Sequence, residues 1–297
     1  MVIGVREVGW PPAAPAGFSE AAEVSGVADT SVLLRQRLDL FGVLIDHVDS
    51  QGAVERIRTF LETGGAHQIV TVNLDFLYLA ERNLGFRRTI NEADLAVPDG
   101  MPLVWLSCTL GTPLKGRVTG VELVHESCRI AAETDSGVFF LGGTPEVAAL
   151  AATHARERYH GLRVTSYSPP FGPISPEEDE RIVESIVRAN PGFLFVALGA
   201  PRQDLWIREH QERLGVPVAM GVGCVLDLLA GTVHRAPPWM QSLGFEWSYR
   251  LMREPRRLWR RYLRDDLPHF WRLWFMALDQ QRTLDRGVGG TADGGLA

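Results

Sequence analysis

The sequence predicts an α/β protein with a Rossmann-like, mostly parallel sheet covered by helices on both faces. Apolar runs of strand length alternate with helical patterns from about residue 30 to about residue 230. Each run is nearly continuously apolar, which is typical of strands buried on both faces by crossover helices. We therefore expect seven strands, at residues 41–46, 67–73, 94–99, 137–143, 162–168, 192–199 and 216–223.

The segments between these strands are predicted to be helices. The stretch "SPEEDERIVESIVRAN" opens with Ser-Pro and several acids, as the first turn of a helix commonly does. Along the 297 residues we expect four regions. They are a disordered leader at 1–35, an α/β catalytic domain at 36–240, a basic amphipathic helical appendage at 241–283 and a flexible tail at 284–297.

Composition and charge exclude several classes of protein. With 45% hydrophobic and 22% charged residues, the chain is ordinary for a globular protein, and its formal net charge of -6 argues against a general nucleic-acid binder. The three cysteines lie far apart, without metal or disulfide spacing, which fits a reducing compartment. The N-terminus lacks a signal-peptide pattern, and no apolar run reaches the ~18 residues that span a bilayer. We expect a cytoplasmic protein.

Polar or glycine-rich residues follow several of the predicted strands. Because the carboxyl ends of parallel strands share one edge, these residues are expected to build a single cleft. They are Thr71 and Asn73, Asp99 and Gly100, Gly142 and Gly143, Gly199 to Gln203, and Gly221 to Gly223.

Asp99 follows a strand directly, in "VPDGMPLVW". A carboxylate at a strand end, next to a glycine that permits close approach, is well placed as a general base. Asp is equally a favoured helix N-cap, so Asp99 can instead cap the helix that follows it. The sequence leaves both roles open.

The other candidates carry similar alternatives. Thr71 and Asn73 can bind sugar hydroxyls or a phosphate, or can serve ordinary turns. Arg117 and the Arg202–Gln203 pair can meet an anionic leaving group, or can lie on a solvated surface.

Two glycine-containing turns suggest nucleotide binding. The backbone of Gly142 and Gly143 can cradle a phosphate or form a plain tight turn. The stretch "GVGCVLDLLAG" matches a dinucleotide fingerprint only weakly, because Leu226 stands where the third glycine belongs. Asp227 in this stretch can accept hydrogen bonds from a ribose or a base.

We expect neither a metal nor a cofactor. No Asp-x-Asp pair follows a strand, and P-loop lysine, Gly-x-Ser-x-Gly and zinc-binding histidine patterns are absent from the sequence. Any reaction that releases a phosphate would therefore depend on protein cations and dipoles.

Residues 249–282 differ in kind from the body. Arginines recur there at spacings of three and four, interleaved with Trp and Tyr, and Pro255 and Pro268 are expected to divide the segment into short helices. This pattern is typical of helices that lie in a membrane interface, although a helical hairpin packed on the body or on a sister subunit fits as well. The arginines are Arg250, Arg253, Arg257, Arg260, Arg261 and Arg264.

Several of these stretches together resemble the TagA–WecG–CpsF family of bacterial glycosyltransferases. The resemblance covers roughly residues 40 to 275 and is carried by "TVN", "NEADLAVPDG", "RVTG", "FLGG", "VALGAPRQDLWI" and the long stretch from Gly221 to Leu263. It implies an inverting, metal-independent transfer of a sugar from a UDP-sugar to a polyprenyl-diphosphate-linked acceptor. It also implies a peripheral location on the inner face of the plasma membrane, with a homo-oligomer possible.

The resemblance assigns roles to individual residues. Asp99 would be the general base, with Thr71, Asn73, Arg117 and Gln203 as polar active-site residues. The C-terminal arginines would serve membrane or acceptor binding, in an appendage that also completes the active site. For nucleotide binding the resemblance points to Asp227 and to Phe171, stacked on uracil. The glycine-rich strand ends add Gly142, Gly143, Gly199 and Gly223 as nucleotide-binding candidates.

Two departures leave the donor sugar open. "TVN" replaces Thr-Pro-Asn, and "PRQD" replaces Pro-Lys-Gln-Glu, while family members use N-acetylmannosamine, its uronic acid or glucose. Two other functions also remain open: a nucleotide-dependent oxidoreductase on a doubly wound sheet, and a non-catalytic membrane adaptor that binds a nucleotide-sugar.

Overall fold

A computed structural model describes residues 35–242 and 244–289. The predicted leader lies outside this range except for Arg35, and so does the predicted tail from residue 290 onward. The predicted boundary between appendage and tail, at 283, falls inside the last helix, which ends at Gly289.

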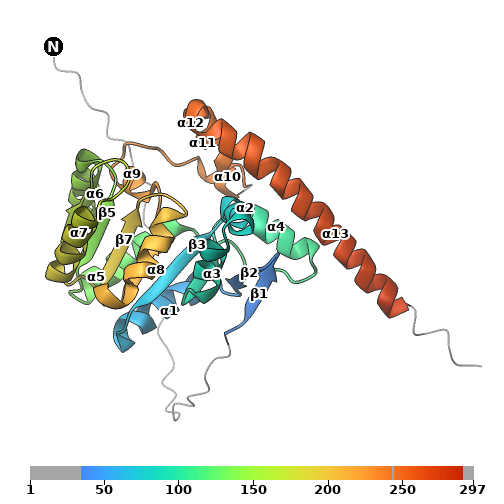
Figure 1. Cartoon of the computed structure of the whole chain (residues 1–297), viewed down its shortest axis with the longest axis horizontal. Coiled ribbons are helices and arrows are strands. Elements are labelled where there is room, and N and C mark those ends of the chain that lie inside the picture. Colours follow the sequence, from blue (N-terminus) through green and yellow to red (C-terminus); the bar gives the residue numbers. More distant parts are fainter. Residues whose placement is uncertain (1–34, 243, 290–297) are drawn as a thin grey trace, which may run out of the picture. The chain divides into compact units, whose positions relative to one another are not determined.

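A six-stranded, fully parallel sheet forms the centre of the chain (Figure 1). Its strand order is β4-β3-β8-β7-β5-β6, which confirms the predicted fold class and six of the seven predicted strands. The strands are β3 (His67–Val72), β4 (Leu95–Pro98), β5 (Val138–Gly142), β6 (Val164–Tyr167), β7 (Phe193–Ala197) and β8 (Val218–Gly221).

Helices cover both faces of this sheet. Within β5 the side chains alternate between two cores: Val138 and Phe140 pack in one, Phe139 and Leu141 in the other. This period of two places apolar residues on both faces, as the continuous apolar runs require. On one face lie α2 (Leu74–Arg82), α3 (Leu84–Glu92), α7 (Pro176–Ala189) and α8 (Arg202–Leu214); on the other lie α1 (Ser50–Thr63), α5 (Gly120–Glu133), α6 (Pro145–Arg158) and α9 (Val225–Leu229).

The strand predicted at 41–46 is one half of a separate hairpin. In it, β2 (Val43–Asp46) pairs antiparallel with β1 (Arg37–Leu40), a strand that the sequence analysis missed. Phe41 and Gly42 join the two strands and both have positive φ, 56° and 87°, as a two-residue type I′ turn requires. Phe is uncommon in this conformation, so its presence concealed the turn.

The C-terminal segment is more continuous than expected. After α10 (Pro238–Ser242) and α11 (Glu246–Arg253), the chain is helical without interruption through α12 (Pro255–Trp259), the π-helical η1 (Arg260–Asp266) and α13 (Leu267–Gly289) (Figure 1). The expectation that Pro268 divides the segment is therefore wrong. Pro268 cannot donate a backbone hydrogen bond, and it lies in the first turn of α13, directly after the π-helical turn that changes the hydrogen-bond register.

This segment packs against the body of the protein. Leu273 of α13 belongs to the apolar cluster of α2, α3 and α4 (Met101–Thr109), and Ala277 is fully buried. The rings of Trp105 and Phe270 also meet, with their centroids 6.3 Å apart. Among the described residues, no helix is both long and apolar enough to cross a bilayer.

A buried carboxylate joins the hairpin to the edge strand β4. Asp46, fully buried at the end of β2, accepts hydrogen bonds from Arg35 at 2.6 Å and from Arg56 at 2.9 Å. It also accepts the backbone N–H of Ala96, in β4, at 2.8 Å. The free edge of β4 is thereby covered, and the strand that leads to Asp99 is fixed in place.

We expect Asp46→Asn to lower the free energy of unfolding by about 3 kcal/mol, because it leaves the three guanidinium groups of Arg35, Arg37 and Arg56 without their buried counter-charge. Urea denaturation measures this loss. Glu133→Gln, which removes an exposed partner of Arg58 and Arg129, is the control and should cost less than about 1 kcal/mol. Equal losses for the two variants would contradict the conclusion that buried Asp46 holds the hairpin against β4.

Candidate active site

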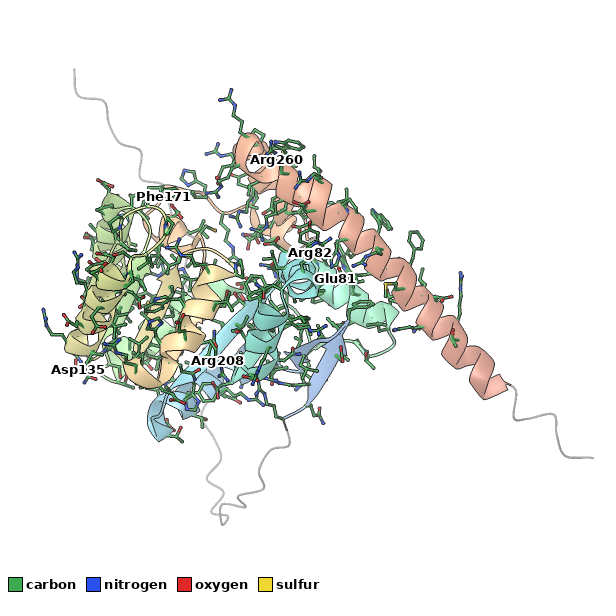
Figure 2. The ribbon with its side chains drawn as sticks, viewed as in Figure 1. Glu81, Arg82, Asp135, Phe171, Arg208 and Arg260 are labelled. Carbon is green, nitrogen blue, oxygen red and sulfur yellow. The ribbon has the colours of Figure 1, made fainter. Side chains whose placement is uncertain are left out.

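The site lies at the edge where the parallel strands end. In Figure 2, Asp135, which precedes β5, and Phe171, which follows β6, lie at opposite ends of the sheet, and Arg260 of the C-terminal segment lies on the side of Phe171. Helices α10 to α12 are on this side as well (Figure 1). The loops after the strands and the C-terminal segment therefore meet at one edge, as expected for a ligand-binding parallel sheet.

Asp99 is held there by backbone hydrogen bonds on two sides. Its N–H donates to the carbonyl of Val72, at the end of β3, at 2.6 Å. Its Oδ2 accepts the N–H of Gly120, the first residue of α5, at 3.3 Å. Helix α4 instead begins after Gly100 with no side-chain cap, so the capping alternative for Asp99 is wrong.

Thr71 and Asp99 converge on Gly120. A Cβ atom added at Gly120 would lie 3.4 Å from Cγ2 of Thr71 and 3.6 Å from Oδ2 of Asp99. The start of α5 thus approaches both side chains closely. Thr71 is buried, whereas Asp99 keeps partial access to solvent.

The charges that face Asp99 are Glu246, Arg117 and Arg235. Burial raises the pKa of Asp99 to about 6; the Gly120 N–H and the two guanidinium groups oppose this rise, and Glu246 adds to it. At neutral pH such a carboxylate is mostly ionised and is a stronger base than an ordinary aspartate. The arrangement suits proton abstraction from a bound hydroxyl group.

A second group of charges lies beside the end of β8. Arg250 of α11 faces Cys224, and together with Arg257 it attracts Asp227 of α9. Burial raises the pKa of Asp227, while the two arginines counteract the rise. Cys224 also faces Asp99, so this group adjoins the first one. The C-terminal segment therefore brings guanidinium groups to the edge that carries Asp99.

Gln203 supports the backbone of the site and is not open to a ligand. It is almost fully buried, and its Oε1 accepts the N–H of Gly223 at 3.1 Å. A Cβ atom at Gly221 would lie 2.5 Å from Nε2 of Gln203, so the glycine turn fits around this amide. Gln203 thus fixes the turn between β8 and α9.

The glycines after β5 and the asparagine after β3 have evident structural roles. A Cβ atom at Gly142 would lie 2.5 Å from the carbonyl oxygen of Ala197, so β5 and β7 approach too closely for any side chain. Gly143, at φ 71°, forms the turn into α6. Asn73 is the N-cap of α2, with its Oδ1 accepting the N–H of Phe76 at 3.2 Å.

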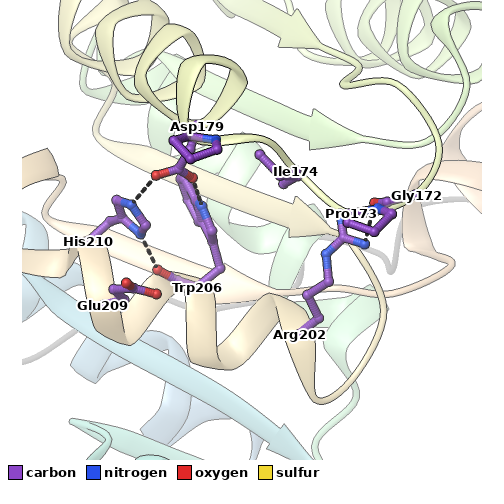
Figure 3. Close-up of a pocket in the computed structure, with 9 residues that line it drawn as sticks. Gly172, Pro173, Ile174, Asp179, Arg202, Trp206, Glu209 and His210 are labelled. Carbon is purple, nitrogen blue, oxygen red and sulfur yellow. Dashed lines mark hydrogen bonds and ion pairs between the residues drawn. The ribbon is translucent and has the colours of Figure 1, made fainter.

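Phe171 is fully exposed in the loop between β6 and α7. The pocket beside it, lined by Gly172, Arg202, Trp206 and His210 among others, is shown in Figure 3. Three of its polar groups are paired with one another: Asp179 accepts from Nε1 of Trp206 at 2.7 Å and lies 2.8 Å from Nε2 of His210. We regard this cluster as structural.

The glycine turn after β5 and Asp99 are well separated along the edge. Three strands, β3, β8 and β7, lie between β4 and β5. At about 4.8 Å per strand, the two ends are roughly 19 Å apart. Only an extended ligand could contact Asp99 and Gly142 together, and Phe171 lies one strand further.

The arginines of the C-terminal segment do not form the single face that their spacing predicts. Arg250 is half-buried, and Arg261 forms an ion pair with Asp75 of α2 at 3.1 Å. Arg257 is exposed but pairs with Glu254, and Arg264 pairs with Asp265. Arg253 and Arg260 are exposed among apolar side chains that are also exposed, which are Met252, Trp259, Leu263, Leu267, Trp271, Phe275 and Met276.

Sequence reasoning missed Arg235, Glu246, Gly120, Cys224 and Asp204 as parts of this site. A signal for Asp204 was present in the sequence, since it is the acid of "PRQD" and directly follows the candidate Gln203. It is fully buried, and burial raises its pKa to about 7.

A sequence model described as the glycosyl transferase WecG/TagA/CpsF family matches residues 38–283. Two proteins of Staphylococcus aureus, from strains MW2 and NCTC 8325, are 34% identical to this chain over 226 residues. Both are named N-acetylglucosaminyldiphosphoundecaprenol N-acetyl-beta-D-mannosaminyltransferase. The alignment covers 75% of this chain and 87% of each relative. The fold is that of an α/β protein, and the family match and the relatives define a glycosyltransferase. The chain belongs to the WecG/TagA/CpsF family of glycosyltransferases, which removes the oxidoreductase and adaptor alternatives.

We expect the stability of Asp204→Asn, relative to the unchanged protein, to rise with pH. The folded protein retains the Asp204 proton up to about pH 7, whereas the unfolded chain releases it near its ordinary value of 3.8. Raising the pH through that window therefore adds a destabilisation of the folded state in the unchanged protein that Asp204→Asn lacks. Urea denaturation of both proteins at about pH 5 and about pH 8 measures the difference, and a pH-independent difference would contradict this description of Asp204.

Proposed function

We propose that the chain transfers a hexose or N-acetylhexosamine from a UDP-sugar to an undecaprenyl-diphosphate-linked saccharide, with inversion and without a metal, in cell-surface polysaccharide biosynthesis. The observation that carries the proposal is the Asp99 carboxylate, partly accessible and with its pKa raised, at the strand edge beside several arginines. The names of the relatives support it, since they describe transfer of an N-acetylmannosaminyl group to N-acetylglucosaminyldiphosphoundecaprenol.

In the proposed reaction, Asp99 accepts the proton of an acceptor-sugar hydroxyl group. The freed oxygen attacks the anomeric carbon of the donor from the face opposite UDP, and the bond between that carbon and the UDP oxygen breaks. One glycosidic bond forms, UDP leaves with the bonding electrons, and the proton remains on Asp99. Thr71 lies beside the carboxylate and is placed to orient the attacking sugar.

The leaving diphosphate requires stabilisation of its negative charge. Arg117 and Arg235 face Asp99, and Arg250 and Arg257 face Cys224 and Asp227 after the end of β8. Guanidinium groups bind phosphate oxygens in a two-pronged manner, so these cations fit the charge that develops on UDP. We infer that they take the place of a bound metal ion. Activity that persists in the presence of a chelator would agree with this inference.

The nucleotide is proposed to extend from these cations along the strand ends. Asp227 is placed to accept hydrogen bonds from the ribose or the base. The glycine-containing turns at Gly142, Gly143, Gly199 and Gly223 border the path, with the N–H of Gly223 already bound by Gln203. Phe171 is exposed and can stack on uracil.

The acceptor carries a polyprenyl chain, so the protein must reach a membrane surface. We propose peripheral binding to the inner face of the plasma membrane through the exposed arginines and apolar residues of the C-terminal segment. Arg253, Arg260, Trp259, Leu263 and Trp271 are all exposed on this segment, and the Arg260 guanidinium lies 5.5 Å from the centroid of the Trp259 ring. A mixture of cations with aromatic residues suits an anionic lipid interface.

We expect Asp99→Asn to fold normally and to lose about 10²–10⁴-fold in transfer rate, because it removes the general base. Mass spectrometry of the products, with a synthetic prenyl-diphosphate N-acetylglucosamine as acceptor, measures the rate. UDP-linked N-acetylmannosamine, its uronic acid and glucose are compared as donors. Asp135→Asn, at the opposite end of the sheet, is the matched control and should retain full activity (Figure 2). Full activity of Asp99→Asn would remove the assignment of the base.

We expect Trp271→Ser combined with Phe275→Ser to weaken co-sedimentation with anionic vesicles by at least about tenfold, since each ring is worth roughly 2 kcal/mol when buried in lipid. Both side chains are exposed, so the fold should persist. Truncation is a poorer test, because it would also remove buried Leu273 and Ala277. Leu84→Ser, exposed on α3, is the control. Unchanged pelleting of the double variant would contradict this membrane surface.

A further inference from the structure

Glu246, the first residue of α11, places its carboxylate between two guanidinium groups of the body. Its Oε2 lies 3.5 Å from Nη1 of Arg117, and its Oε1 lies 3.5 Å from Nε of Arg235. Each oxygen thus serves a different arginine. The side chains of all three residues are between 17% and 27% exposed, so the charges are only partly screened by solvent.

The two arginines come from separate loops at the strand edge. Arg117 lies between α4 and α5, and Arg235 lies between α9 and α10. Arg235 has a second acidic neighbour, since its Nη2 lies 3.7 Å from Oε1 of Glu122. At these separations the groups attract one another as charges rather than through well-formed hydrogen bonds. The guanidinium groups therefore retain the freedom to turn toward other anions.

Asp99 is the other anion that these arginines face. The groups around its carboxylate are the Gly120 N–H, Arg117, Arg235 and Glu246, together with the thiol of Cys224 from the end of β8. Both cations near Asp99 are thus the cations that Glu246 holds. Of this set, Glu246 is the member that the C-terminal segment supplies.

We propose that Glu246 is a positioning residue for the base: it draws Arg117 and Arg235 away from the Asp99 carboxylate, so that docking of α11 keeps Asp99 a strong proton acceptor. The proposal rests on the proposed role of Asp99 as the general base. Without Glu246, both guanidinium groups would turn toward Asp99 and would stabilise its ionised form. A more stable carboxylate accepts a proton less readily and catalyses more weakly.

The test measures the titration of Asp99 in the full-length protein. The carboxyl carbon signal of Asp99 in ¹³C NMR, identified by its absence in Asp99→Asn, gives the titration midpoint directly. The pH dependence of the transfer rate provides a second, independent readout.

Four variants separate the effect of charge from that of packing. Glu246→Gln should lower the Asp99 midpoint by about one pH unit, since it removes a facing negative charge and releases two cations. Arg235→Gln should raise the midpoint, because it removes a facing positive charge. Glu246→Asp, which keeps the carboxylate, should bring the midpoint most of the way back to that of the unchanged protein. Glu122→Gln removes a more exposed acid that pairs with Arg235 and not with Arg117, so it should lower the Asp99 midpoint by clearly less than Glu246→Gln does.

An unmoved midpoint in Glu246→Gln would overturn the proposal. Shifts of Glu246→Gln and Arg235→Gln in the same direction would also overturn it, because loosening of α11 alone would act on both variants alike. The NMR titration requires no turnover. A chain that transfers no sugar would therefore contradict the proposed function while leaving the Glu246 experiment fully interpretable.

Discussion

The position of the Asp99 carboxylate is the constraint on which the rest of the structure depends. It must be buried enough for its pKa to rise, yet open enough to meet a substrate. The backbone of Val72 on one side and that of Gly120 on the other fix it at the end of an edge strand. An edge strand holds a side chain firmly only when its free edge is also supported. The hairpin provides that support through Asp46, which binds the backbone of β4 at Ala96.

The site combines charges from two parts of the chain that are far apart in sequence. The α/β body supplies Arg117 and Arg235, while the C-terminal segment supplies Glu246 and Arg250. Helix α13 keeps the C-terminal segment in place by burying Leu273 in the apolar cluster of α2, α3 and α4. The same segment exposes aromatic residues and arginines on its outer surface. Under the proposed function, this one segment both adjusts the electrostatics of the site and presents the surface that meets lipid.

Local sequence patterns predicted the strands and the residues at their ends, because burial on both faces leaves a continuous apolar signal. They placed Thr71 and Asp99 together correctly, since parallel strands end at one edge. They also suggested a phosphate-binding role for Gly142, yet its close contact with Ala197 already explains the glycine. A glycine in the sequence shows that a position has no side chain. Only the structure shows whether a ligand or, as at Gly142, a neighbouring strand occupies the space.

The pairing of Glu246 with Arg117 and Arg235 could not be predicted in the same way. These contacts join residues more than ten positions apart across loops, and no periodicity encodes which loops meet. The continuity of the helix through Pro268 was hidden for a related reason. A π-helical turn has no strong sequence signature, although it lets a proline follow within a helix.

A crystal structure of the chain with UDP and a prenyl-diphosphate N-acetylglucosamine analogue would test the central claim most directly. The account predicts an acceptor hydroxyl oxygen within about 3 Å of a carboxylate oxygen of Asp99, with the diphosphate against the arginines at the end of β8. An acceptor sugar bound away from Asp99, for instance in the pocket beside Trp206 in Figure 3, would contradict it.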